Sequence, residues 1–186
     1  RLPAADPRAV GRLPDAVLAG RIEPLGEPPR EPVRHVLDDE DPEIGLQREF
    51  AERMAADAGE DEYGRLSVTA GHYADIEVVE TVPREAFDPQ PRVESAVVRT
   101  TPREPEYTVP DDRFFMGFLK AVFTQRRKTM RNAVRNTAHI SGLGDPDAVV
   151  DAAEEELMSA RAGTVTPAEF AQLATLAYDV GEPGGH

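Results

Sequence analysis

The chain has 186 residues, no cysteine and a formal net charge of −14. This length is enough for one full domain or one and a half, and an apolar fraction of 40% is compatible with a packed core. The absence of cysteine excludes disulfide bonds, thiolate metal sites and cysteine nucleophiles. No run reaches the roughly 18 apolar residues of a membrane-spanning helix, and the first residues do not resemble a signal segment, so the sequence predicts a cytoplasmic protein.

The basic residues are almost all arginine, because only Lys120 and Lys128 are lysines among the 21. An acidic surface that is poor in lysine and aromatic residues is typical of proteins that stay soluble in concentrated salt. A GC-rich genome, which favours Arg, Ala, Gly and Pro, would give the same composition without salt. The sequence favours a halophilic source and does not exclude an anionic partner, since binding depends on local charge.

Residues 1–46 differ from the rest of the chain. They contain eight of the 17 prolines and no Phe, Tyr, Trp or Met. Prolines break helices and cannot pair in central strands, and without aromatic residues there is little to bury. This segment is therefore predicted to be mostly irregular, with one short helix around residues 13–19.

From residue 47 the sequence predicts a mixture of helix and strand. The stretch 47–57 has apolar residues at helical spacing and predicts a helix. The stretch 63–74 fits either a strand or a short helix. The stretches 75–82 and 94–101 are rich in β-branched residues and predict two strands at the edge of a sheet, joined by a proline-containing loop.

After Pro110 the chain is predicted to be helical, and the tail 182–186 is expected to fray. Three stretches carry capping signals at their starts: 111–123 with Asp111 or Asp112, 145–158 with Asp145 followed by Pro146, and 166–180 with Thr166 and Glu169 as a capping box.

One window of this acidic chain has no acidic residue. Residues 113–144 contain seven Lys or Arg and no Asp or Glu. If residues 114–137 form one helix, a rotation of about 100° per residue places four cations on one stripe. These are Arg127, Lys128, Arg131 and Arg135. Arg126 falls instead on the apolar face, where it must extend to the surface, pair internally or mark a distortion of the helix.

A one-sided cationic stripe suits a phosphate backbone, because guanidinium groups bind phosphate in a bidentate manner. The alternative is a solvated helix face whose charges pair with the acidic remainder of the protein. The long acid-free window favours nucleic acid as the partner, without implying that a base sequence is read.

Several motifs resemble those of a known enzyme family. The stretch "FDPQPRVESAVV" is similar to a Phe-x-Pro-x-Pro-x-Val-x-Ser motif of the rRNA adenine dimethyltransferases, and "FTQRRKTMRNAV" to the helical-domain signature of their small-subunit branch. The stretches "QREFAERM", "DEYGRLSV" and "RAGTVTPAEFAQLA" follow the order and spacing of that family. The resemblance covers residues 47–180 and is strongest to archaeal, in particular haloarchaeal, members.

The resemblance implies a fold, a cofactor and a partner. The expected fold is α/β, the C-terminal part of a Rossmann-like methyltransferase domain over residues 47–110, followed by a small all-α RNA-binding domain over residues 111–181. Members of the family transfer methyl groups from S-adenosylmethionine to N6 of two adjacent adenines near the 3′ end of small-subunit rRNA. By resemblance, the rRNA of the maturing small subunit is the partner of the basic segment.

Phe87 carries most of the expected chemistry. Enzymes that modify a base take it out of its stack, and an aromatic face replaces part of the lost stacking. By resemblance Phe87 stacks on the target adenine, and Pro89 and Pro91 stiffen its loop. Without the resemblance, a core Phe at the sheet edge is the simpler interpretation. Three further residues of the resemblance are expected to make structural polar contacts: Gln47, Glu49 and Arg53.

The cofactor motifs of the family are not found in this sequence. They include a glycine-rich turn after the first strand, an acidic residue for the ribose and an Asn-Leu-Pro-Tyr loop. S-adenosylmethionine is thus implied by resemblance, while no cofactor-binding or catalytic residue is identified. A non-catalytic rRNA-binding or ribosome-assembly module and a DNA-associated role remain alternatives. No metal site is expected, since the four histidines are far apart in sequence: His35, His72, His139 and His186.

Overall fold

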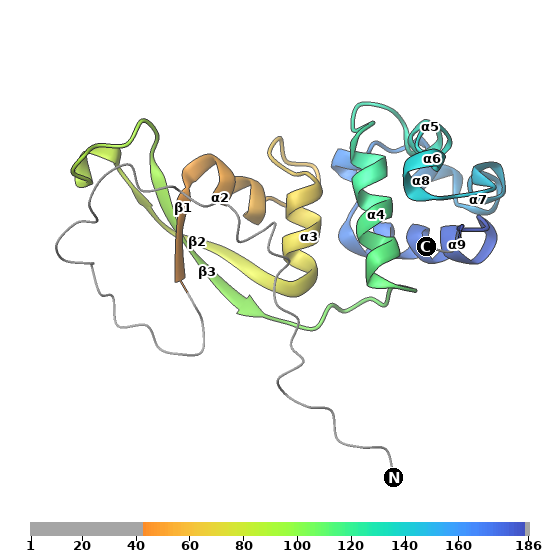
Figure 1. Cartoon of the computed structure of the whole chain (residues 1–186), viewed down its shortest axis with the longest axis horizontal. Helices are drawn as coiled ribbons and strands as arrows, with labels where there is room; N and C mark the ends of the chain where they lie inside the picture. Colours follow the sequence, from red (N-terminus) through yellow and green to blue (C-terminus); the bar gives the residue numbers. More distant parts are fainter. Residues whose placement is uncertain (1–42, 185–186) are drawn as a thin grey trace, which may run out of the picture.

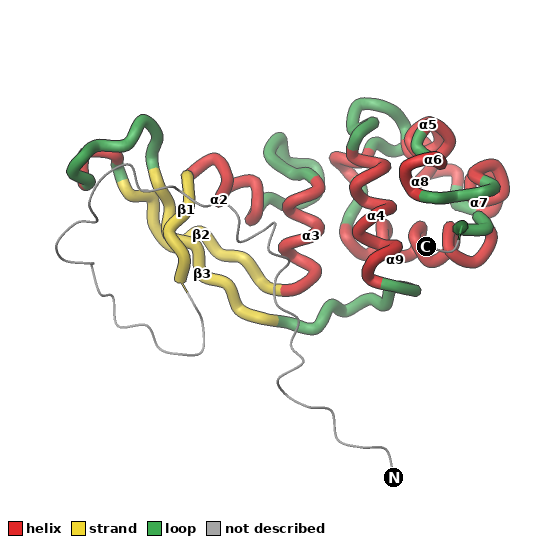
Figure 2. The backbone as a smooth tube through the Cα atoms, viewed as in Figure 1, coloured by secondary structure: helices red, strands yellow, loops and turns green. Residues whose placement is uncertain are grey.

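The computed structural model describes residues 43–184 (Figure 1). The predicted helix around residues 13–19 lies outside the described residues. The N-terminal part of the described chain is a three-stranded antiparallel sheet with two helices against it, and the C-terminal part is helical (Figure 2). The first part comprises β1 (Glu43–Gln47), α2 (Arg48–Ala55), α3 (Arg65–Tyr73), β2 (Ala74–Val82), the 3-10 helix η1 (Arg84–Ala86) and β3 (Ser95–Pro102).

The sheet has the order β1-β3-β2, so β3 lies in the middle. Val98 of β3 pairs with Ile44 on one side and Val78 on the other. Side chains alternate along β3, and the buried Ala96 and Val98 pack against the buried Ala51 of α2. β2 and β3 confirm the two strands predicted over residues 75–82 and 94–101. β1 begins at Glu43, ahead of residue 47, where the sequence places the start of the α/β part.

Residues 63–74, whose pattern fits either a strand or a short helix, contain the helix α3 in the structure. Its first turn is closed by a bond from the Gly64 amide to Ser67 Oγ at 3.0 Å. Ser67 Oγ in turn donates to the main-chain carbonyl of Arg53 at 2.6 Å, which joins the start of α3 to α2. The buried side chains of α3 include Val68 and His72, one turn apart on the same side of the helix.

The helical part is built from short helices. These are α4 (Asp112–Phe123), α5 (Met130–Asn136), α6 (Ala138–Ser141), α7 (Pro146–Ala152), α8 (Glu155–Ser159), the 3-10 helix η2 (Ala162–Thr164) and α9 (Pro167–Val180). None of the helices within residues 43–184 combines the length and the apolar character that crossing a membrane requires.

The predicted caps of this part are confirmed. Asp111 Oδ1 accepts from the Phe114 amide at 2.7 Å, and Asp145 Oδ1 from the Ala148 amide at 2.9 Å. Thr166 and Glu169 form the capping box of α9. Each cap satisfies amides that have no partner within the helix.

The prediction of one helix over residues 145–158 is wrong, because the chain is extended at Ala153 and Glu154. In one continuous helix, Val149 and Met158 would point to opposite sides, since nine residues rotate the side chain by about 900°. Both are fully buried in the same core. The break between α7 and α8 is what brings Met158 back to that core.

One hydrophobic core joins the sheet part to the helical part. Tyr63, from the α2–α3 loop (residues 56–64), is 1% exposed and packs in the core that Phe118 and Phe170 occupy. Its hydroxyl donates to the carbonyl of Val165 at 2.7 Å. α3 lies between the sheet and α4 (Figure 1), so the two parts are packed together and not merely tethered.

His72 forms a second contact across this junction. Its Nδ1 lies 3.2 Å from the Tyr107 hydroxyl and its Nε2 lies 3.6 Å from Asp112 Oδ1 at the start of α4. The rings of Tyr73 and Phe115 stand 4.8 and 5.3 Å from the imidazole, centroid to centroid. Burial lowers the pKa of His72, although Asp112 acts in the opposite direction, and Arg103 lowers it further.

We expect the free energy of unfolding to depend on pH through His72. Because its folded pKa is lowered, the unfolded state binds more protons, so the contribution is complete above the unfolded value of about 6.5 and is lost as pH falls below it. Denaturant unfolding at pH 7.5 and pH 5.5 should show a smaller loss of stability for His72→Gln than for the wild-type chain. Exposed His139 provides the control, as His139→Gln should keep the wild-type dependence. Equal losses in all three proteins would contradict the prediction.

Candidate nucleic-acid interface

The predicted basic helix is interrupted. α4 ends at Phe123, residues 124–129 form a turn, and α5 begins at Met130. Thr124 Oγ1 donates to the carbonyl of Ala121 at 2.6 Å, and the Met130 amide donates to the carbonyl of Ala160 at 2.8 Å. The prediction of one helix over residues 114–137 is thus wrong, and so is the single cationic stripe that followed from it.

The physical reason is the position of Arg126. In a continuous helix this cation would lie on the apolar face that Leu119 and Val122 bury, which is costly for a charge. With the helix ended at Phe123, Arg126 is exposed, while Met130 and Ala133 of α5 are fully buried.

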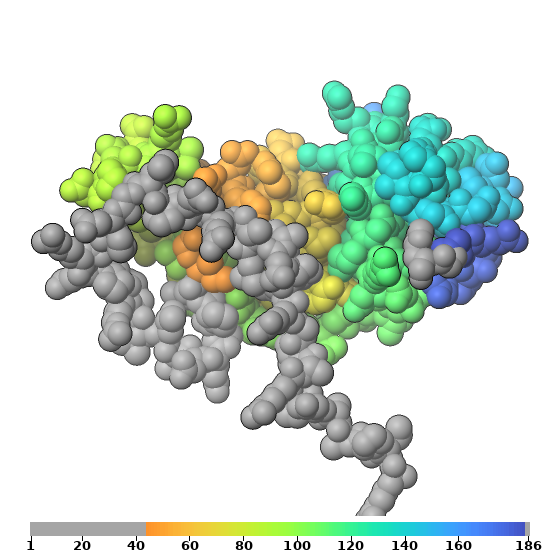
Figure 3. All heavy atoms as spheres, in the orientation of Figure 1, coloured from red at the N-terminus to blue at the C-terminus, as the bar shows by residue number. Residues whose placement is uncertain are grey.

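Arg127 and Lys128 lie in this basic turn (residues 124–129). Both side chains are exposed, and neither has a hydrogen-bond or ion-pair partner among residues 43–184. In Figure 3 the blue-green atoms of the segment project from the upper edge of the molecule. Two adjacent cations without a carboxylate partner can therefore contact an anion at no cost in existing ion pairs.

Arg131 and Arg135 have a different environment, on α5. Arg131 bonds to Glu155 of α8, and Arg135 Nε donates to Asp147 Oδ1 of α7 at 2.6 Å. The hydrogen bond from Arg131 lowers the pKa of the Glu155 carboxyl. For these two cations the structure shows the pairing with acidic residues that the sequence offered as the alternative. Exposed pairs of this kind are weak, so an RNA phosphate could compete for either arginine.

Sequence reasoning missed Arg161 next to the basic turn. Thr129 and Arg161 form an antiparallel bridge, which places the Arg161 backbone beside the turn. The Arg161 side chain is exposed and has no partner within the described residues. It lies more than thirty positions away in the sequence, so only the path of the chain brings it to the interface.

Phe87 lies on the β2–β3 loop (residues 83–94), directly after η1. Its side chain is 41% exposed, and that of Val93 on the same loop is 48% exposed. Pro89 is exposed and Pro91 half-buried. The ring is therefore outside the described core and open to solvent. Figure 1 places this loop and the basic turn at the same upper edge, at opposite ends of the molecule.

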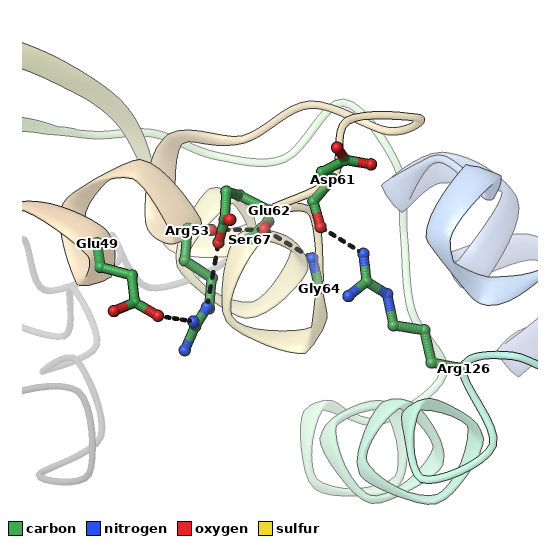
Figure 4. A network of polar contacts seen from close by, with 7 residues as sticks. All are labelled: Glu49, Arg53, Asp61, Glu62, Gly64, Ser67 and Arg126. Atoms are coloured by element: carbon green, nitrogen blue, oxygen red, sulfur yellow. Dashed lines mark hydrogen bonds and ion pairs between the residues drawn. The ribbon is translucent and has the colours of Figure 1, made fainter.

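Glu49 and Arg53 form polar contacts within the sheet part (Figure 4). Arg53 Nη2 donates to Glu49 Oε1 at 2.8 Å, and its Nε lies 3.8 Å from Glu62 Oε2. Gln47 is the exposed last residue of β1 and pairs with Ser95 across the sheet. This geometry agrees with a structural part for Glu49 and Arg53.

The described residues do not fit S-adenosylmethionine. Such a cofactor needs a glycine-rich turn between a strand and a helix, where the backbone can approach it closely. β1 is followed at once by Arg48, β2 by Pro83 and β3 by Arg103. Residues 43–184 thus provide no cradle of this kind, and they contain no group of three or more His, Asp or Glu placed to hold a metal ion.

Comparison with known proteins places the chain in a family. A family model described as ribosomal RNA adenine dimethylase matches residues 38–166. A probable ribosomal RNA small subunit methyltransferase A from Haloarcula marismortui is 82% identical over 138 residues, which are 74% of this chain and 48% of the relative. The corresponding protein from Natronomonas pharaonis is 73% identical over 135 residues, 73% of this chain and 49% of the relative. The chain spans about half the length of the curated relatives it matches.

A solved structure supports the fold. The crystal structure of a dimethyladenosine transferase from Plasmodium falciparum has a TM-score of 0.59 and 21% sequence identity, covering 75% of this chain and 57% of that one. The match confirms the predicted α/β class, and the haloarchaeal relatives confirm the resemblance. The chain belongs to the ribosomal RNA adenine dimethylase family.

Proposed function

We propose that this chain takes part in S-adenosylmethionine-dependent dimethylation of adenine N6 in small-subunit rRNA, as the portion of the enzyme that holds the RNA. The observation that carries the proposal is a pair of exposed cations, Arg127 and Lys128, whose side chains have no partner among residues 43–184, in a family member with a net charge of −14. The names of the haloarchaeal relatives, probable ribosomal RNA small subunit methyltransferase A, support the choice of RNA.

The basic turn and Phe87 have different roles in this proposal. Arg127 and Lys128 contact phosphates and fix the position of the RNA, without reading its bases. Arg131, Arg135 and, less directly, Arg126 belong to the same cationic segment. Phe87 offers its face to the adenine after the base has left its stack. In this proposal the described residues bind and orient the RNA, and no step of the methyl transfer is assigned to them.

Replacing Arg127 and Lys128 should weaken RNA binding in a salt-dependent way. Each phosphate contact on a single strand contributes about 0.7 to the slope of log K against log salt, so Arg127→Gln with Lys128→Gln should reduce the slope by about 1.4. The measurement is fluorescence anisotropy of a labelled fragment from the 3′ end of small-subunit rRNA over a series of potassium chloride concentrations. A slope equal to that of the wild-type chain would refute the assignment.

The matched control is Arg48→Gln. Arg48 is also exposed, but it pairs with Glu52 and Glu94 at 2.6 Å each, and it lies on α2. Its replacement should leave the slope unchanged. Duplex DNA in the same assay tests the DNA-associated alternative, which requires a preference for duplex DNA over the rRNA fragment.

Truncating Phe87 should weaken binding of single-stranded oligoadenylate. Stacking of a base on an aromatic ring contributes about 1–3 kcal/mol, so Phe87→Ala should reduce the affinity about 5- to 150-fold. Phe87→Tyr keeps the aromatic face and should retain the affinity. Val93→Ala removes a comparably exposed apolar side chain from the same loop, and should have little effect. Equal losses for Phe87→Ala and Val93→Ala would argue against stacking.

A non-catalytic rRNA-binding or ribosome-assembly module is the second candidate. It is favoured by the lack of a glycine-rich turn after any strand in residues 43–184. We expect titration calorimetry of the purified chain with S-adenosylmethionine, in molar potassium chloride, to show no saturable heat while RNA binding persists. Saturable binding would show that this chain has a cofactor site and would reject the second candidate.

A further inference from the structure

We propose that Arg126 is a positioning residue, which fastens the basic turn to the α2–α3 loop and so fixes where Arg127 and Lys128 stand. This inference rests on the proposed function, because the basic turn has a task only if it meets RNA. It separates Arg126 from the two cations that follow it in the sequence.

The contact on which this proposal rests joins two residues that are 65 positions apart in the sequence. Arg126 Nη2 donates to the main-chain carbonyl of Asp61 at 2.7 Å (Figure 4). The acceptor is a backbone oxygen, so the bond is independent of the Asp61 carboxylate. A charged donor makes a stronger hydrogen bond than a neutral one, which suits a single fastening between two loops.

The same guanidinium group lies over η2. A Cβ built on Gly163 would stand 3.6 Å from Arg126 Nε and 3.8 Å from its Nη2. The Gly163 carbonyl accepts from the Gly59 amide of the α2–α3 loop at 2.9 Å. Arg126 therefore sits where three segments meet: the basic turn, the α2–α3 loop and η2.

The α2–α3 loop is itself held in place on both sides. Tyr63 anchors it in the core of the helical part through its bond to Val165. At its other side, Glu62 lies near Arg53, and Ser67 Oγ bonds the carbonyl of Arg53 (Figure 4). Arg126 thus binds an acceptor that is already fixed to α2 and α3.

This arrangement links the basic turn to the loop of Phe87 through a frame of packed elements. α2 packs on β3, where Ala51 contacts Ala96 and Val98, and β2 and β3 carry the loop of Phe87. Contacts to phosphates set the register of the RNA, and a base reaches Phe87 only if that register is correct. A bond that fixes the basic turn to this frame therefore affects how well both sites engage one RNA.

The test compares Arg126→Met with Arg127→Met. In the free chain, Arg126→Met should raise amide hydrogen exchange about tenfold in residues 56–64 and 124–129, since a lost hydrogen bond of about 1.4 kcal/mol corresponds to that factor. Arg127→Met should leave exchange unchanged. Asp61→Ala is a second control, because it keeps the carbonyl acceptor and should keep exchange slow.

RNA binding by the same variants, under conditions where all are folded, separates positioning from the other roles. Arg126→Met should weaken binding of the rRNA fragment several-fold with an unchanged salt slope, while Arg127→Met lowers the slope by about 0.7. A lowered slope with unchanged exchange would make Arg126 a phosphate ligand and overturn the proposal. Faster exchange with unchanged RNA affinity would also overturn it, by reducing Arg126 to a stabilising contact.

A different outcome concerns the proposed function and not this inference. If the unsubstituted chain fails to bind the rRNA fragment, the proposed function is refuted. The exchange data alone then decide whether Arg126 fastens the two loops.

Discussion

The burial of Tyr63 is the contact on which the arrangement of the two parts depends. The ring comes from a loop of the sheet part, yet it is packed among helical residues and stands edge-on to Phe123, 6.4 Å between centroids. A buried tyrosine needs a partner for its hydroxyl, and the carbonyl of Val165 provides it. Because this one side chain satisfies both an apolar and a polar requirement, the sheet part cannot move relative to the helical part without exposing the ring or breaking the bond.

Spacing along the sequence was a poor guide to the charge around the basic segment. Residues 113–144 contain no acidic residue, but α7 and α8 fold back and bring Asp147 and Glu155 to Arg135 and Arg131. The acid-free window in the sequence is thus not acid-free in space. Within residues 43–184, the side chains of Arg127 and Lys128 in the turn at residues 124–129 have no such acidic partner. In concentrated salt the screening length falls to about 3 Å, so what matters is direct contact rather than net charge.

Much of the fold could be predicted from local patterns, and the errors have a common cause. The caps of α4, α7 and α9 and the alternation in β3 are local and were visible in the sequence. The two long helices predicted over residues 114–137 and 145–158 are both interrupted in the structure. A continuous helix would bury the charge of Arg126 in the first case and would turn Met158 away from the core in the second. One feature of the sequence did argue against the helix over residues 114–137, because a cation at position 126 conflicts with its apolar face.

In the candidate site, too, local patterns reveal some residues and miss others. Phe87, Arg127 and Lys128 could be singled out because a motif or a charge pattern marks them. Asp61 could not, since its contribution is a main-chain carbonyl, which every residue has and no pattern reveals. Arg161 is likewise brought to the basic turn by a backbone bridge to Thr129.

The backbone contacts of Asp61 and Arg161 explain how an acidic chain can present a basic site in a fixed place. Two adjacent cations on a free turn would lose much of their binding energy to ordering of the chain. A third cation of the same run, bonded to the backbone of the neighbouring loop at 2.7 Å, removes part of that cost before any anion arrives. In this interpretation three consecutive basic residues have two different tasks, and the division between them follows from where the helix ends rather than from their chemistry.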